Sequence, residues 1–178
     1  MPTIEPWLRG PVAGVPPVLM PAAHAVLHAV EDAERALEGL TADEIWTRPG
    51  GAPPVGFHLR HLAGALARLL TYARGEMLSD VQREMVKREG EPGDPPADAG
   101  ALMALVRAAA EAALAQIRST PASSILDARA VGRQRLPSTV LGLVVHAAEH
   151  AARHAGQAIT TARIVRGLRE GGLAPYGA

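Results

Sequence analysis

Residues 139–167 read TVLGLVVHAAEHAARHAGQAITTARIVRG, a long segment rich in Ala, Val and Leu with a regular set of polar residues. His146, His150 and His154 follow one another every four residues, and Gln157 comes three residues later. On a helix, a four-residue step turns the side chain by only about 40° and rises about 6 Å, so these residues form one polar row. Neutral imidazoles on an apolar stripe need a partner, and two His at this spacing commonly bind a divalent metal. The segment therefore predicts a helix that carries a metal site.

Other histidines offer rival or additional ligands. His24 and His28 lie four residues apart in a second helical segment, and His58 and His61 lie three apart near the start of a third. An isolated His on a helix is usually a surface or core residue with a local partner, whereas three at strict spacing favour a metal site. The residues alone leave open which other histidines join the row.

Four segments have apolar positions at helical spacing and end near glycine or proline. They are residues 22–37, 55–74, 97–118 and 139–167. No segment shows convincing alternation with period two, and no Asn-Gly or Asp-Gly hairpin signal occurs. The predicted class is all-α, with the 178 residues forming one four-helix-bundle domain.

The ends of the chain differ from the helical segments in composition. Residues 1–21 hold six prolines and predict an extended N-terminal arm, which Trp7 and Leu8 can anchor on the bundle. Residues 168–178 predict a frayed C-terminal tail.

The connections between the helices also have distinct compositions. Residues 41–55 and 119–137 predict irregular loops. Residues 76–96, with a short helix near 78–88, are numerous enough to cross the bundle, which permits parallel neighbouring helices.

The composition narrows the function classes. Lys plus Arg at 18 balance Asp plus Glu at 18, so no global field draws the chain to nucleic acid or an anionic membrane. Aromatic residues make up 3%, which leaves few stacking platforms for single strands. Without cysteine, disulfides, thiolate catalysis and Cys-type zinc sites are excluded. With no signal-peptide pattern and no long apolar run, we expect a cytoplasmic protein with neither nucleic-acid nor membrane partners.

Common enzyme motifs are weak or absent. His146, Glu149 and His150 give H-x-x-E-H, the inverted zinc-peptidase spacing, but the only later acidic residue is Glu170, in the predicted tail. H-E-x-x-H, G-x-S-x-G, Walker A and strand-borne G-x-G-x-x-G sequences do not occur. The candidate helices also lack the Glu-x-x-His of ferritin-like di-iron bundles.

Three short stretches carry a family resemblance: GFHLRHLAG at 56–64, EHAARHAGQ at 149–157 and WTRPG at 46–50. Together they resemble the DinB-like (DinB/YfiT) superfamily over nearly the whole chain. The resemblance implies a four-helix bundle with an up-down-down-up course and a three-His metal site. By position it implies these ligands: His61, His150 and His154. His61 is preferred to His58 because it precedes a Leu-Ala pair, as in the family motif.

Further positions follow or depart from the family pattern. Gln157 matches the end of the family's His-x-Gly-Gln signature, and Gly156 would permit close helix contact. Many relatives have an Arg after the final His, whereas Ala155 stands here and Arg153 precedes that His. A role for this Arg in steering an anionic substrate therefore does not carry over.

We hypothesise a metal-dependent enzyme with an open site of three His ligands plus water. The metal would be zinc or nickel, with iron or manganese as further candidates. The superfamily includes thiol-dependent S-transferases and isomerases, which implies transfer of a low-molecular-weight thiol to an electrophile, with metal-assisted hydrolysis as a related activity. Homodimers are common among its members, so we also expect a homodimer.

The alternative is a non-catalytic metal-binding or stress-response bundle protein. A fourth protein ligand would close the site, and His58 or His24 is the best candidate. His146, one turn before His150, either orients a ligand or fills the core.

Overall fold

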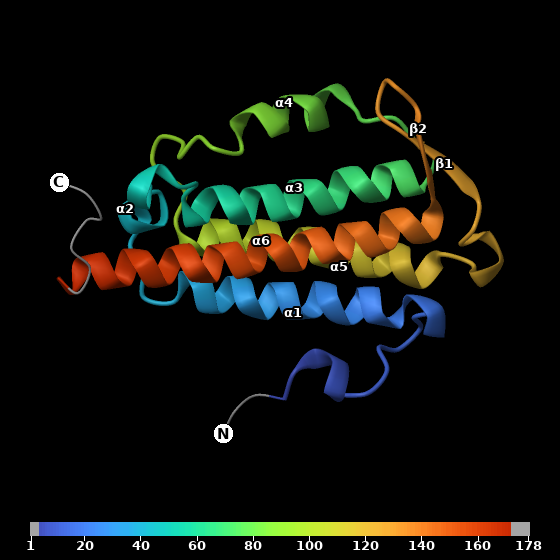
Figure 1. Ribbon diagram of the computed structural model, residues 1–178, viewed down its shortest axis with the longest axis horizontal. Coiled ribbons are helices and arrows are strands. Elements are labelled where there is room, and N and C mark those ends of the chain that lie inside the picture. The colour runs from blue at the N-terminus through green and yellow to red at the C-terminus, as the bar shows by residue number, and fades with distance from the viewer. Residues whose placement is uncertain (1–3, 172–178) are drawn as a thin grey trace.

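The computed structural model describes residues 4–171, in which four long helices form a bundle (Figure 1). They are α1 (Met20–Leu37), α3 (Val55–Ala73), α5 (Ala99–Ser119) and α6 (Val140–Arg169). Both α5 and α6 pack against α1 and α3. In Figure 1, α1 and α6 run in one direction while α3 and α5 run in the other. The predicted all-α bundle and its up-down-down-up course are confirmed.

Side chains cap the N-termini of α5 and α6, the two helices that follow long connections. At the start of α5, Asp98 accepts a hydrogen bond from the backbone N–H of Ala101 at 2.8 Å. At the start of α6, Thr139 accepts one from the N–H of Gly142 at 3.0 Å. These caps satisfy backbone donors that have no partner inside the helix.

Alanines make up most of the buried face of α6. They recur every three or four residues, which places them on one stripe of the helix. The buried alanines are Ala147, Ala148, Ala151, Ala155, Ala158 and Ala162. Leucines of α3 such as Leu59, Leu62 and Leu66 are also fully buried in this core. Because alanine side chains are short, α6 lies close to its neighbours, which brings the polar row of α6 near α3.

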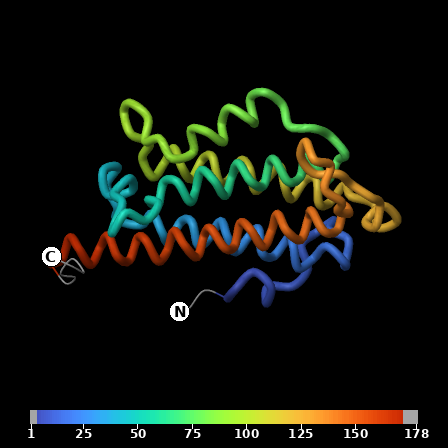
Figure 2. Tube along the Cα trace, turned by 45° about the horizontal axis from the view of Figure 1, so that its top comes forward, coloured from blue at the N-terminus to red at the C-terminus, as the bar shows by residue number. Residues whose placement is uncertain are grey.

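The connection between α3 and α5 contains α4 (Asp80–Arg88), which lies outside the bundle along α3 (Figures 1 and 2). Ser79 and Gln82 form a capping box at its start. No residue within α4 is buried, and Gln82 donates to Thr71 Oγ1 of α3 at 2.8 Å. The parallel course of α3 and α5 agrees with the expected crossing connection.

One described helix, α5, is long and apolar enough to cross a membrane by length and composition alone. Core helices of bundles share these features. The inner face of α5 buries Leu102, Val106, Ala110 and Ile117 in the bundle.

The expectation of an irregular connection over residues 119–137 is wrong in part. After the short 3-10 helix η4 (Ala122–Ser124), β1 (Ala128–Val131) and β2 (Leu136–Thr139) pair as an antiparallel hairpin. The turn between them lacks Asn-Gly and Asp-Gly, and strands of four residues are too short to show alternation. Gly132 and Arg135 in this turn have φ angles of 69° and 50°, a left-handed conformation that the usual hairpin dipeptides would have signalled.

Residues 41–55 are more ordered than the predicted loop. Thr41 and Glu44 form a capping box that begins the short helix α2 (Ala42–Ile45), and a 3-10 turn η3 (Pro49–Gly51) follows. The side chain of Trp46 is buried, and its indole N–H donates to the Ala97 carbonyl at 2.9 Å.

The predicted N-terminal arm is present, but it is not extended along its whole length. It contains the 3-10 helices η1 (Pro6–Leu8) and η2 (Pro17–Leu19), because proline fixes φ at values that such turns accept. Trp7 and Leu8 do not anchor the arm, since each is 58% exposed. Leu19 is buried instead, and Arg9 Nη2 donates to Glu31 of α1 at 2.9 Å.

The C-terminal end of the bundle differs slightly from the prediction. α6 continues to Arg169, beyond the expected end near Gly167. Most of the predicted tail, residues 172–178, lies outside the described residues.

Candidate metal centre

Two helices supply the histidines of the candidate site. His61 lies in the second turn of α3, and His150 and His154 lie near the middle of α6. α3 shares its most extensive interface with α6, where the buried alanines of α6 let the helices approach. The row predicted on α6 therefore faces α3, which contributes the third imidazole.

The three imidazoles converge. The Nε2 atoms of His61 and His150 are 2.9 Å apart, and the ring centres of His61 and His154 are 4.4 Å apart. The ring centres of His150 and His154 are separated by 4.6 Å. One nitrogen from each of the three rings lies within 4.8 Å of the other two. The cluster can therefore hold a metal ion.

The donor set fits a divalent metal. At a zinc–nitrogen distance of about 2.0–2.1 Å, nitrogens of a tetrahedral site lie about 3.3 Å apart. The Nε2 atoms of His61 and His150 are 2.9 Å apart, and all three pairs of nitrogens lie within 4.8 Å. Imidazole donors suit zinc, nickel and iron. The Nε2 of His150 faces His61, and the Nδ1 on the far side of the same ring is buried without a hydrogen-bond partner.

Residues 22–158 match the sequence profile of the DinB superfamily, a span that includes all three histidines. The chain belongs to the DinB superfamily. A search among curated proteins gave no match. The family and the four-helix fold expected from the sequence are thus confirmed, and the cluster of this DinB protein consists of the residues that the resemblance implied.

His58 lies beside the cluster of the DinB site without joining the three converging nitrogens. It is only 5% exposed, and its Nδ1 is 3.2 Å from the Nδ1 of His154. One of these two atoms carries the proton that the other accepts. The hydrogen bond fixes the orientation of the His154 ring, so His58 is a neighbour of a ligand in this arrangement.

The rival pair on α1 is occupied elsewhere. His24 Nε2 is 3.0 Å from the Gly10 carbonyl oxygen, and His28 Nε2 is 3.5 Å from Asp32 Oδ1. Both contacts are local to α1 and the N-terminal arm. The suggestion that His24 closes the site as a fourth ligand is therefore wrong for this arrangement.

His146 and Arg153, two further polar residues of α6, have contacts at the surface. His146 Nδ1 is 3.1 Å from Glu149 Oε2, and Arg153 pairs with the same carboxylate. His146 therefore does not fill the core, and the side chain of Arg153 is half exposed. Gly156 does not permit a close helix contact as expected, because nothing lies within 4 Å of where its Cβ would be.

Burial is the main influence on the charge state of His150, His154 and the neighbouring His58. Burial and, to a smaller extent, the neighbouring imidazoles of His61, His150 and His58 together lower the pKa of His154 to about 4. Burial also lowers the pKa of His150 and of His58. These rings are therefore neutral at pH 7, the form that donates a lone pair to a metal.

One contact of the site was missed by the sequence prediction. The Nδ1 of His61 donates to Oε2 of Glu89 at 2.7 Å, and Glu89 follows the last residue of α4. Burial raises the pKa of Glu89, but hydrogen bonds from His61 and Arg68 outweigh this effect and hold it below its ordinary value. Glu89 comes from a charged connection in which no motif distinguishes it from the glutamates around it.

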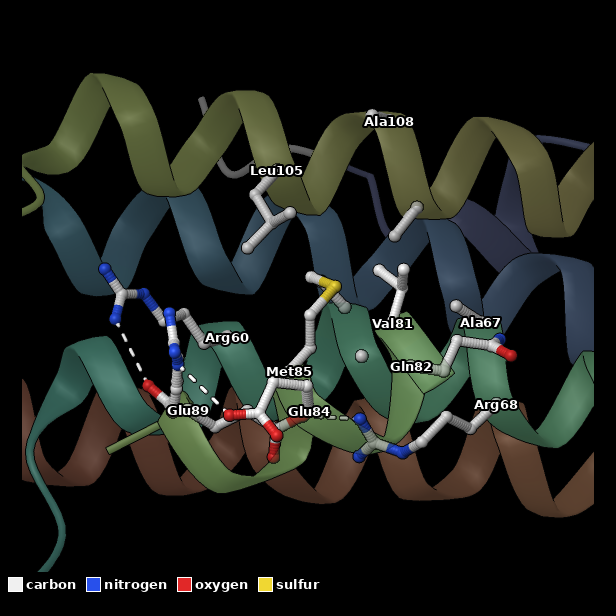
Figure 3. Close-up of a pocket in the computed structure, with 14 residues that line it drawn as sticks. Arg60, Ala67, Arg68, Val81, Gln82, Glu84, Met85, Glu89, Leu105 and Ala108 are labelled. Carbon is white, nitrogen blue, oxygen red and sulfur yellow. Dashed lines mark hydrogen bonds and ion pairs between the residues drawn. The ribbon is translucent and has the colours of Figure 1, made fainter. Parts of the chain in front are cut away.

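A cavity of about 540 Å³ lies between α3, α4 and α5 (Figure 3). Its walls are mainly apolar, with Ala67, Met85 and Leu105 among the lining residues. Glu89 lines it together with Arg68. The carboxylate of Glu89 thus contacts the histidine cluster through His61 and also borders this cavity.

Proposed function

We propose that this DinB-superfamily protein is a metal-dependent enzyme in which His61, His150 and His154 bind one divalent metal and leave a coordination position open. The observation that carries the proposal is the convergence of three imidazoles from two facing helices. All three rings are only partly buried, which leaves a path for a small molecule. Zinc or nickel are the first candidates for the metal, followed by iron or manganese.

The proposed reaction is transfer of a low-molecular-weight thiol to an electrophile. When bound, the metal supplies Lewis acidity that favours the deprotonated form of a thiol or water at the open position. The chain itself has no cysteine, so the thiol comes from solution. Phe57 is stacked on His61 with ring centres 5.4 Å apart and covers one face of that ring.

Cobalt substitution tests this activity. Adding a small thiol to the cobalt-loaded protein is expected to produce a sulfur-to-metal charge-transfer band, because no protein thiolate contributes to that signal. The His150→Ala protein is expected to show no band, whereas His146→Ala, on the same face of α6 but outside the cluster, is expected to keep it. If no common cellular thiol gives a band while cobalt stays bound, thiol transfer is contradicted in favour of hydrolysis or a non-catalytic metal site.

If the protein is a non-catalytic metal-binding protein, His58 is expected to be a fourth metal ligand. If His58 moved to become a fourth ligand, the site would be closed, as in structural zinc sites. X-ray absorption on the zinc-loaded protein counts the imidazole ligands. Three imidazoles with one light-atom ligand from solvent support the enzyme, and four imidazoles that fall to three in His58→Ala support the closed site.

A further inference from the structure

Glu89 is the one acidic residue among the described residues that is buried, at 5% exposure. A buried carboxylate is unfavourable unless both of its oxygens have strong partners. Here Oε2 accepts from His61 Nδ1 at 2.7 Å, and Oε1 accepts from Arg68 Nη1 at 2.5 Å. The two donors lie seven residues apart on α3, which places them on the same face of that helix.

Gly64 lies between these two donors on α3 and makes room for the carboxylate. A Cβ at position 64 would overlap Oε1 of Glu89 and would also lie too close to Arg68 Nη1. The backbone here is helical, so the glycine is not required by a turn, and a helix-interior glycine costs about 1 kcal/mol relative to alanine. The close approach of Glu89 to α3 is the physical reason for a glycine at this position.

The contact to His61 determines which nitrogen of that ring is available. When Nδ1 carries the proton that Glu89 accepts, the neutral form of the ring has its lone pair on Nε2. The Nε2 atom is the one that lies 2.9 Å from His150 Nε2, inside the cluster. A carboxylate that accepts from the far nitrogen of a metal-binding His fixes its tautomer and ring orientation and makes it a stronger donor.

We propose that Glu89 is the positioning residue of the metal centre, holding His61 with Nε2 toward the metal, and that Gly64 and Arg68 hold Glu89 in turn. This proposal rests on the proposed function, since it assigns a role toward the same metal. Glu89 directly follows α4, whose own residues are all at least partly exposed. Metal binding is therefore coupled to the docking of the α4 segment on α3.

Zinc affinity, measured by competition with a chromogenic chelator on the full chain, tests the role of Glu89. Loss of such a carboxylate partner is expected to weaken zinc binding by about 10–100-fold in Glu89→Ala. Glu89→Gln is expected to lose less, because its amide oxygen still accepts from Nδ1. Glu84→Ala is the matched control on α4, since the ion pairs of Glu84 within residues 4–171 are with Lys87 and Arg88, and it is expected to bind zinc like the wild type.

A pair of glycine substitutions tests the same role without touching the carboxylate. Gly64→Ala is expected to displace the carboxylate of Glu89 and weaken zinc binding, but by less than Glu89→Ala, because the overlapping atoms are the ends of flexible side chains that can shift. Gly156→Ala is the matched control, because it is also a helix-interior change near the cluster but its Cβ meets nothing within 4 Å. Circular dichroism of each variant verifies that the bundle is folded.

Nuclear magnetic resonance gives a readout that a purely structural role would not move. In the wild-type protein the Nδ1 proton of His61 is expected to be protected from exchange and shifted downfield by the carboxylate, and Glu89→Ala is expected to lose this signal. Unchanged zinc affinity in folded Glu89→Ala and Gly64→Ala would overturn the role of Glu89 alone. X-ray absorption that shows a Glu89 oxygen bound to the metal would also overturn it, whereas a wild-type protein that binds no zinc would overturn the proposed function and this role together.

Discussion

His150 with His154 on α6 and His24 with His28 on α1 are the same sequence pattern in two different surroundings. Each pair has the four-residue spacing that puts two imidazoles on one helix face. The α6 pair faces α3, where His61 completes a set of three converging nitrogens. The α1 pair contacts a backbone carbonyl and a neighbouring aspartate instead.

The difference between the two pairs shows that spacing within one helix supplies only part of a metal site. The facing helix has to contribute a ligand, and the packing has to bring the helices close. At the α6 pair, the buried alanines of α6 let α3 approach. Glu89, which follows α4, accepts a hydrogen bond from His61, the imidazole that α3 contributes. At the α1 pair, none of the contacts found for either histidine leads to another imidazole.

Removing one imidazole from each pair gives the largest expected contrast. His150→Ala is expected to lower metal affinity by at least about 100-fold, exceeding the usual cost of losing a residue that only supports a ligand. His28→Ala is expected to leave the affinity unchanged. Metal content per chain, measured on untagged protein by mass spectrometry, checks both. The assignment would be wrong if a substitution at His24 or His28 emptied the site while His61→Ala did not.

The free energy of unfolding is expected to depend on pH through His154 of the cluster. Burial lowers the pKa of His154 to about 4 in the folded protein, whereas the unfolded chain has the ordinary value near 6.5. Between these values the unfolded state binds more protons, so the stability contributed by neutral His154 is complete above pH 6.5 and declines as pH falls toward 4. Below pH 4 this group adds no further loss.

Urea unfolding of the metal-free protein at pH 8, 6, 5 and 4 measures this decline. The free energy of unfolding is expected to fall less steeply with decreasing pH in His154→Gln, because this variant lacks the imidazole whose pKa is lowered to about 4. Equal slopes in the two proteins would contradict the assignment of the decline to His154.

Periodicity in the sequence was sufficient to predict the bundle. Apolar spacing placed all four long helices to within two residues at each end, because each helix buries one continuous face. The hairpin formed by β1 and β2 could not be predicted in this way, since its strands have only four residues and its turn lacks the usual dipeptides. The burial of Trp46 and the exposure of Trp7 depend on long-range packing that the sequence pattern does not specify.

Some residues of the candidate site were likewise predictable from the sequence, and others were not. His150 and His154 were predictable from spacing, and the family motif in residues 56–64 indicated His61. Glu89 was not predictable, because its partners on α3 are 21 and 28 residues away in sequence and depend on how α4 docks. The different roles of Gly64 and Gly156 also depend on a tertiary contact, because only position 64 faces a buried carboxylate.

The smallest expected effect concerns His24 and tests whether the α1 pair is structural. His24 Nε2 contacts the Gly10 carbonyl and so joins α1 to the N-terminal arm. A hydrogen bond of this kind contributes about 0.5–1.5 kcal/mol, and because this one is exposed we expect a loss of about 0.5 kcal/mol in His24→Ala. The arm also has the Arg9 to Glu31 ion pair, so it is expected to remain docked. Urea midpoints report the stability, and metal affinity should stay at the wild-type value. A loss of metal in this variant would mean that α1 contributes to the site, which would remove the contrast between the two pairs.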